Sequence, residues 1–288
     1  MRIAITGSSG LIGTAAAAYF QARGHAITRV RRQRGRLDLD TAHLEGQDVV
    51  IHLAGANIAG RRWSRRYKKL LYSSRIETTT QLCTILSQMN TPPQLLLCAS
   101  AIGIYGNIEP PAYVNEGILM GDGFLYKLCT DWEHSTHLAE EMGIRVVHMR
   151  FGIVLSPKGG ALGKMLPVFR MGLGGRLGSG KQMMSWIVLG EVPAVMEHVI
   201  NTPGLSGAVN FVAPQAVSNA EFTRVLAKAM RRPAFLPVPA LAIKILFGEM
   251  GKELLLSGAN VIPKRLIESG YVFRYPDLET ALSKMFSR

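Results

Sequence analysis

Residues 2–21, which read RIAITGSSGLIGTAAAAYFQ, decide the fold of this chain. RIAIT is apolar enough for a buried strand, and LIGTAAAAYFQARG predicts a helix that ends at Gly24. Between them stand three glycines at a spacing of three, and HAITRV (25–30) predicts a second strand directly after the helix. A strand, a turn, a helix and a strand within about thirty residues form a βαβ unit.

The same alternation continues along the chain. Strands are expected at 48–55, 94–100 and 144–152, and helices at 64–89 and 126–142. Strands that alternate with helices predict an α/β protein with a Rossmann-type, doubly wound and mostly parallel sheet.

The composition changes after Ser156. Residues 156–187 are rich in glycine and methionine and are expected to form loops and a short helix on the substrate side. We therefore predict a nucleotide-binding domain over 1–230 and a small C-terminal domain over 231–288, which contributes to a smaller substrate-side lobe and ends in an amphipathic helix.

Composition and cysteine usage limit the class of protein. Of 288 residues, 48% are hydrophobic and 18% charged, which indicates a folded globular protein and excludes a disordered one. Cys83, Cys98 and Cys129 lack metal-ligand spacing, so neither a disulfide framework nor a zinc site is expected. We expect a reducing, cytoplasmic location and no membrane span.

A net charge of +13 raises the question of an anionic partner. Much of it lies at 29–36 and 61–75, and no Asp or Glu occurs between Val49 and Ile76. The alternatives are an anionic cofactor or substrate, nucleic acid, and a solvated basic surface. Since no helix-turn-helix, zinc-finger or RNP signature accompanies the arginines, nucleic acid is the less favoured partner.

The glycine turn predicts dinucleotide binding. Gly7 permits the tight turn, Gly10 lets the backbone approach a pyrophosphate, and Gly13 lets the helix pack on the strand. The N-terminus of the helix offers free N–H groups and a partial positive charge to the phosphates. Ser8, Leu11 and Ile12 belong to the same predicted site.

The end of the second strand favours NADP over NAD. An enzyme that binds the free ribose hydroxyl of NAD commonly carries a carboxylate there. Here the chain has Arg31 and Arg32, whose guanidinium groups suit a 2′-phosphate. The first carboxylate is that of Asp38, which is expected to border the adenine or to lie in a surface turn.

Two further patterns suggest other chemistry and are set aside. GRLGSGKQ (175–182) matches a phosphate loop up to its lysine, but Gln182 replaces the required Ser or Thr and a predicted strand follows. His134 and His137 share a helix face near Glu133 and Glu141, but a third ligand is not evident, and no metal site is predicted.

These motifs together resemble the extended, epimerase-like branch of the short-chain dehydrogenase/reductase superfamily. TGSSGLIG opens the chain, LAG ends the third strand, and SAIGIYG matches the serine-rich strand end of that branch. LAGANIAGRRW, SRIETT, DWE, GIVLSPKGGAL, GLGGRLGSGKQMMSWI and GANVIPKRLIESGYVFRYPDL resemble an atypical subfamily with its own small C-terminal domain.

The resemblance implies an NADP-binding Rossmann domain and further site residues. It covers essentially the whole chain. Dimers are common in the superfamily, so a homodimer is one alternative that the sequence leaves open. Arg75 stands where ordinary extended members carry Asn, and it is expected to reach the phosphates or the ribose of the cofactor. The remaining cofactor-binding residues are expected at strand ends: Leu53, Ala54, Gly55, Ser100 and Gly152.

The same resemblance indicates a non-standard active site. The catalytic Ser or Thr position falls on Ala101, with Ser100 one place away; the catalytic tyrosine falls on Tyr126, and its lysine partner on Thr130. WIVLGE (186–191) also lacks the His and Asp of the subfamily loop. Without a nearby cation the hydroxyl of a tyrosine has a pKa of about 10, so the residue is a weak general base at neutral pH.

Three functions remain open on the sequence. One is an oxidoreductase or epimerase that acts on a small substrate, with Tyr126 as the candidate catalytic residue. The second is a catalytically inactive NADP-dependent sensor or binding protein. The third is a basic protein associated with nucleic acid.

Overall fold

The computed structural model describes residues 1–30, 32–33, 36–37, 41–118 and 121–287. Its chain contacts form two compact units, each assembled from several segments. The first unit comprises 1–101, 127–150 and 192–209, and the second comprises 102–126, 151–191 and 210–288. The sequence-based domain boundary at residue 230 stays a prediction.

The main sheet has six strands in the order β11-β7-β6-β5-β1-β2. β1 is parallel to β2 and to β5, with Ile3 opposite both Ile27 and Val49, and β5 is parallel to β6. Residues of β5 are buried throughout, as expected of a parallel strand covered on both faces. The strands are β1 (Arg2–Thr6), β2 (Ala26–Val30), β5 (Val49–His52), β6 (Leu95–Ala101), β7 (Arg145–Phe151) and β11 (Gly207–Phe211).

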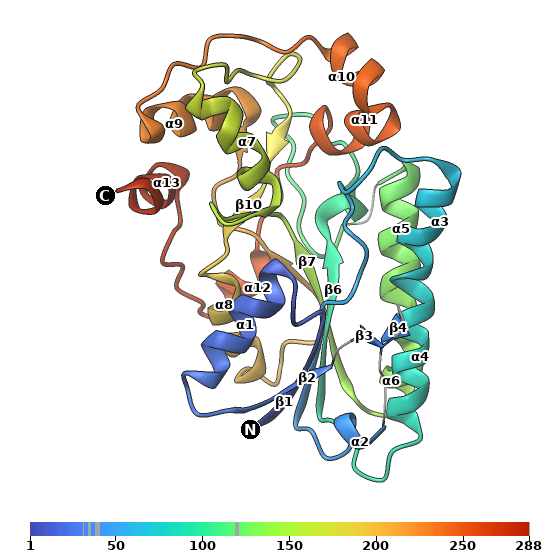
Figure 1. Ribbon diagram of the computed structural model, residues 1–288. Coiled ribbons are helices and arrows are strands. Elements are labelled where there is room, and N and C mark those ends of the chain that lie inside the picture. The colour runs from blue at the N-terminus through green and yellow to red at the C-terminus, as the bar shows by residue number, and fades with distance from the viewer. Residues whose placement is uncertain (31, 34–35, 38–40, 119–120, 288) are drawn as a thin grey trace. The chain divides into compact units, whose positions relative to one another are not determined.

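Helices cover both faces of this sheet. α1 packs against α8 on one face, and α4 packs against α3 and α6 on the other (Figure 1). The predicted α/β Rossmann-type fold is therefore confirmed. The bounds are α1 (Leu11–Gln21), α2 (Thr41–Leu44), α3 (Arg65–Ser73), α4 (Ile76–Ser87), α6 (His137–Glu141) and α8 (Val192–Ile200), with a short hairpin of β3 (Arg32–Gln33) and β4 (Arg36–Leu37).

The direction of strand order reverses at β1. The next strand in sequence, β2, lies on one side of β1, and the following strand of the sheet, β5, lies on the other. In doubly wound sheets ligands bind outside the carboxyl ends of the strands at such a reversal. The ends of β1 and β5 are therefore the place to examine for a cofactor site.

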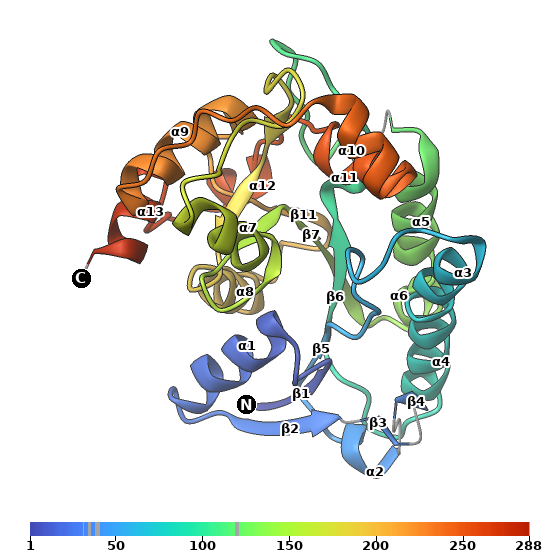
Figure 2. The same cartoon turned by 45° about the horizontal axis from the view of Figure 1, so that its top comes forward.

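The second unit has its own apolar core. Trp186, Phe222 and Leu282 are buried in it, and α9 packs against α13 (Figure 2). β8 pairs in parallel with β10, and β9 pairs antiparallel with β12. The elements are η1 (Ile102–Tyr105), β8 (Ile153–Leu155), α7 (Gly160–Arg170), β9 (Met183–Met184), β10 (Trp186–Val188), β12 (Val217–Ser218), α9 (Asn219–Met230), α10 (Ala240–Phe247), α11 (Glu249–Leu255), α12 (Lys264–Glu268) and α13 (Leu278–Phe286).

The prediction of one helix over 64–89 is wrong. α3 ends at Ser73 and α4 begins at Ile76, with Arg75 between them at φ −110° and ψ −67°. The apolar period continues across the break, so periodicity alone does not reveal it. The guanidinium of Arg75 donates to the carbonyl of Ala56. Because Ala56 lies outside the helix in sequence, the spacing of apolar residues along the helix cannot predict this contact.

The helix predicted over 126–142 is also divided, into α5 (Gly123–His134) and α6. Thr136 stands at the break, where its hydroxyl donates to the carbonyl of Glu133 at 2.8 Å. Ser135 similarly donates to the carbonyl of Trp132. Such local hydrogen bonds from hydroxyl side chains compete with continued helix.

Candidate cofactor site

The glycine turn is packed too closely for side chains at two of its positions. Gly7 has φ +65°, and a Cβ built there would lie 2.7 Å from the carbonyl carbon of Leu53. A Cβ on Gly13 would lie 2.3 Å from the carbonyl oxygen of Gly7. These contacts bring the end of β1, the start of α1 and the end of β5 together, as the motif predicts.

The start of α1 is suited to an anion. Gly10 is its N-cap and has no side chain to accept from the first N–H groups, and the first turn contains no acidic residue. Gly10 and Ser9 are exposed, while Leu11 and Ile12 are half-buried and Ser8 is buried. The free N–H groups of a helix N-terminus and their partial positive charge favour a phosphate. The described residues therefore fit the pyrophosphate of a dinucleotide.

A buried chain of hydrogen bonds holds the two strand ends together. The Thr6 hydroxyl oxygen accepts from the N–H groups of Leu53 and Ala54 at 3.2 and 3.3 Å. With both lone pairs used, this hydroxyl donates to Nδ1 of His52 at 2.7 Å. His52 then carries its proton on Nε2 and donates to the Thr79 hydroxyl at 3.0 Å. The chain requires a neutral imidazole.

His52 should make stability depend on pH. Burial lowers the pKa of His52 from 6.5 to about 4. Between these values the unfolded chain binds a proton that the folded chain does not, so stability falls as the pH is lowered through this range. The shift corresponds to about 3 kcal/mol. Urea unfolding at pH 7.5 and 4.5 should show this loss.

The variant His52→Gln should lose less stability than wild type over that interval. A part of the loss will remain, because burial also lowers the pKa of His148. Equal losses in the variant and wild type would show that His52 does not contribute to the pH dependence.

The Arg75 side chain binds backbone carbonyl groups of its own protein. Its guanidinium donates to the carbonyls of Ala56 at 3.0 Å and Leu71 at 3.2 Å. It also lies 5.0 Å from the centre of the Trp132 ring, and a Cβ on Gly55 would lie 3.3 Å from its Cζ. Arg75 therefore positions the loop after β5, and direct contact with a cofactor stays a prediction.

The residues predicted to select NADP are only partly described. Arg31 and Asp38 lie outside the described residues, and only the backbone of Arg32 is described, in β3. A further cation lies beside the glycine turn: the guanidinium of Arg29 donates to the carbonyl of Ser8 at 3.4 Å. Arg29 is not among the residues predicted to bind the cofactor, although it stands one residue before the end of β2.

Ser100 is part of a buried ionic network. Its hydroxyl donates to the Glu133 carboxylate at 2.6 Å. Arg150 binds the same carboxylate through Nε and Nη2, both at 2.8 Å. Burial by itself raises the pKa of Glu133, but the hydrogen bonds and charge of Arg150 outweigh it and hold the pKa below its usual value. The Ser100 hydroxyl is thus bound to an ionised acceptor.

Tyr126 lies on α5 in the second unit, and its ring packs on Gly121, where a built Cβ would lie 2.7 Å from Cδ2. Lys127 does not supply the missing cation to it, because its ammonium group binds Asp131 at 2.8 Å. Thr130, at the position of the absent lysine, has a buried hydroxyl oxygen without a hydrogen-bond partner among the described residues.

Replacing Thr130 with valine should raise the free energy of unfolding by about 1 kcal/mol, because an unpaired buried hydroxyl is removed without loss of volume. Urea unfolding measures the change. If the variant is instead less stable, the hydroxyl has a partner in solution.

Thr79→Val is the matched control. The Thr79 hydroxyl accepts from His52 and from Trp132 Nε1, both at 3.0 Å. The same substitution there leaves two buried donors unpaired and should lower the free energy of unfolding by at least about 2 kcal/mol.

Gly152 is also in the second unit, and a Cβ there would lie 2.6 Å from the carbonyl oxygen of Ser185. Its close contact is therefore with protein backbone, and its predicted role toward the cofactor stays untested.

Other reactive groups are accounted for by local contacts. Burial raises the pKa of Cys83 and Cys129 to about 12, which disfavours the thiolate form that a nucleophile needs. Glu133 binds Arg150, while the ring of His137 stacks on that of His134. Within the described part of the chain, no group of three or more His, Cys, Asp and Glu side chains is placed to hold a metal ion.

The segment 175–182 does not have the geometry of a phosphate loop. The two residues of β9 follow it rather than a helix, and a Cβ on Gly175 would lie 1.6 Å from the carbonyl oxygen of Leu236. Its glycines permit close packing against another segment of the second unit.

The sequence model of the NAD dependent epimerase/dehydratase family matches residues 3–211. The chain belongs to this family. A second model, for a domain of unknown function (DUF1731), matches residues 238–285. The predicted resemblance to epimerase-like proteins with an additional C-terminal domain is thereby confirmed.

Relatives of this epimerase-family protein match over nearly their whole length. Epimerase family protein Mb2239 of Mycobacterium bovis is 41% identical over 297 residues, which cover 99% of this chain and 98% of the relative. Human epimerase family protein SDR39U1 is 36% identical over 293 residues, with 99% of each chain covered.

A crystal structure of human SDR39U1 (isoform 2) with NADPH has a TM-score of 0.92 to this epimerase-family protein. The two are 35% identical, and the match covers 99% of each chain. The predicted dinucleotide-binding Rossmann fold is confirmed, and the NADPH in the human protein agrees with the prediction of NADP.

No helix in the described ranges combines the length and apolar character needed to cross a bilayer.

Proposed function

We propose that this epimerase-family protein is an NADP-dependent oxidoreductase or epimerase that acts on a small substrate through a non-standard active site. The observation that carries the proposal is the start of α1. It has exposed glycine backbone at its N-cap, no capping side chain and no acidic residue in the first turn. Such an end binds phosphate groups.

The choice of NADP rests on charge. Arg29 lies beside the glycine turn, and Arg31 and Arg32 follow it before the first carboxylate at Asp38. Guanidinium groups bind a phosphate bidentately, whereas a 2′-hydroxyl is commonly bound by a carboxylate. The NADPH bound to human SDR39U1 supports the same choice.

The bound cofactor would supply hydride transfer. The residues of the chain would then bind the cofactor, orient it and assist proton transfer to or from the substrate. Tyr126 is the one member of the standard catalytic set that is retained, and we infer that it contacts the substrate. Since Thr130 and the ion-paired Lys127 offer it no cation, the transferred proton would come from the substrate or from water.

Titration of NADPH and NADH into the purified protein, followed by nicotinamide fluorescence, tests the cofactor. NADPH should bind at least about tenfold more tightly than NADH, and the Arg31→Ala/Arg32→Ala variant should lose this preference. Arg61→Ala/Arg62→Ala removes two exposed arginines of the other basic stretch and should leave both affinities unchanged. Failure of both cofactors to bind would contradict the proposal.

An NADP-dependent sensor is the second candidate. It is favoured by Ala101 and Thr130, which replace the hydroxyl and the cation of the standard mechanism, and by the fixed Ser100 hydroxyl. Single-turnover oxidation of NADPH across a panel of carbonyl compounds separates the two candidates. Oxidation of NADPH by a member of the panel supports the enzyme, and slower oxidation by Tyr126→Phe would support contact between Tyr126 and the substrate. Tight NADPH binding without any oxidation supports the sensor.

A further inference from the structure

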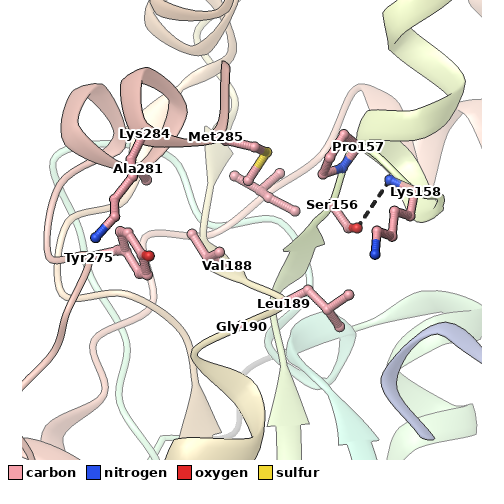
Figure 3. Close-up of a pocket in the computed structure, with 11 residues that line it drawn as sticks. Ser156, Pro157, Lys158, Val188, Leu189, Gly190, Tyr275, Ala281, Lys284 and Met285 are labelled. Carbon is pink, nitrogen blue, oxygen red and sulfur yellow. Dashed lines mark hydrogen bonds between the residues drawn. The ribbon is translucent and has the colours of Figure 1, made fainter. Parts of the chain in front are cut away.

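A pocket of about 240 Å³ lies within the second unit at the carboxyl ends of β8 and β10. Its remaining wall comes from α13 and the residue Tyr275 before it (Figure 3). We call it the α13 pocket. None of the residues predicted to bind the cofactor lines it.

The interior of the α13 pocket is mainly apolar. Leu155 ends β8, Val188 ends β10, Leu189 follows it, and Met285 and Ala281 face them from α13. Leu155 and Ala281 are nearly fully buried, so these surfaces are set by the core of the unit. A ligand with an apolar body would therefore remove apolar area from water on binding.

Two lysines stand on opposite sides of this apolar surface. Lys158 belongs to the turn between β8 and α7, and Lys284 belongs to α13 (Figure 3). Neither forms an ion pair with a carboxylate within the described part of the chain. The ammonium group of Lys284 instead lies 5.6 Å from the centre of the Tyr275 ring. No described residue that lines the pocket is acidic.

Ser156 adds a hydroxyl group to the same wall as Lys158. It is 2% exposed, and its oxygen accepts from the backbone N–H of Lys158 at 3.2 Å. This bond fixes the turn and leaves the hydroxyl hydrogen available to an acceptor. Cationic and hydroxyl donors beside an apolar floor match one kind of ligand: an organic anion with a hydrocarbon body.

We propose that the α13 pocket binds a small organic anion with an apolar body, of the size and chemistry of a medium-chain carboxylate. The volume is below the range of roughly 300–1,000 Å³ typical of sites for drug-sized ligands, which favours a compact molecule. The carboxylate interacts with Lys158 beside the Ser156 hydroxyl, Lys284 adds positive potential from the opposite side, and the hydrocarbon covers Leu155, Val188 and Met285.

The first experiment uses octanoate as the probe on the full-length protein. Isotope-labelled methionine methyl groups are observed by NMR, and the Met285 signal is assigned with Met285→Leu. Octanoate should shift the Met285 signal saturably. Octan-1-ol lacks the charge and acetate lacks the body, so each should bind at least about fivefold more weakly. Equal binding of octanol or acetate, or no saturable shift of Met285, would overturn the proposal.

Variants test the same residues by calorimetric titration of octanoate. Lys158→Gln/Lys284→Gln should weaken binding at least about fivefold, whereas Lys181→Gln, an exposed lysine outside the pocket, should not change it. Ala281→Leu fills the pocket and should abolish binding. Unchanged affinity in the double lysine variant would overturn the proposal without relying on the fold of the Ala281 variant.

Discussion

Replacing Glu133 with alanine should lower the free energy of unfolding by about 3–5 kcal/mol, as expected when one partner of a buried ion pair is removed. The side chains of Glu133 and Arg150 are only 13% and 4% exposed. Without the carboxylate, the Arg150 guanidinium stays buried as an uncompensated charge, and the Ser100 hydroxyl loses its acceptor. Urea unfolding at pH 7 measures the change.

Two variants separate the ion pair from the loss of volume. Glu133→Gln keeps the shape but not the charge, and it should be destabilised nearly as much as Glu133→Ala. The double variant Glu133→Leu/Arg150→Met should recover most of the loss, because a buried ion pair replaced by apolar residues of similar volume is often neutral. A double variant as unstable as the single one would show that packing, and not charge, dominates at this position.

Glu140→Ala is the surface control. The Glu140 side chain is 41% exposed and approaches His137 at 3.7 Å. Its removal should change the free energy of unfolding by no more than about 0.5 kcal/mol. A large change in the free energy of unfolding for Glu140→Ala would show that any loss of a carboxylate in this region destabilises the protein, and not specifically the loss of the buried ion pair.

Gly13→Ala should disrupt both the fold and cofactor binding. The new Cβ would lie 2.3 Å from the Gly7 carbonyl oxygen, so the start of α1 must move away from the turn. Overpacking of this kind costs about 1–3 kcal/mol of stability. The displaced N–H groups should also weaken NADPH binding at least about tenfold, since helix N-terminal donors must meet the phosphates directly.

Gly163→Ala is the matched control for that variant. Gly163 also lies in the first turns of a helix, α7, but a Cβ there would meet nothing closer than 3.9 Å. Alanine in place of glycine inside a helix should then stabilise the protein by about 0.5–1 kcal/mol. NADPH affinity should stay unchanged. A loss of stability in Gly13→Ala together with a gain in Gly163→Ala would show that the loss comes from close packing at the glycine turn. Equal changes in stability for the two variants would contradict this interpretation.

The non-standard active site has a structural counterpart in these contacts. The serine nearest to the expected catalytic position, Ser100, donates to Glu133 and is held within the buried network. Lys127, the lysine next to Tyr126 in sequence, is bound by Asp131. Neither residue replaces its missing counterpart, which supports the proposal of substrate-side proton transfer and leaves the sensor as the second candidate.

The sequence by itself determined the features that local backbone geometry requires. The spacing of Gly7, Gly10 and Gly13 after an apolar strand predicted the turn, the βαβ unit and the dinucleotide-binding fold. This works because a strand, a tight turn and a helix N-terminus within about thirty residues leave few alternative arrangements. The resemblance of many further motifs to epimerase-like proteins predicted the family.

Only the tertiary structure decided the contacts between residues far apart in sequence. The break between α3 and α4, the tautomer of His52 and the pairing of Glu133 with Arg150 depend on which side chains share a buried space. A hydropathy pattern records which face of an element is apolar, but not which polar group from another element meets it. The physical reason is desolvation: a buried donor or charge is stable only beside its partner, and folding alone brings that partner near.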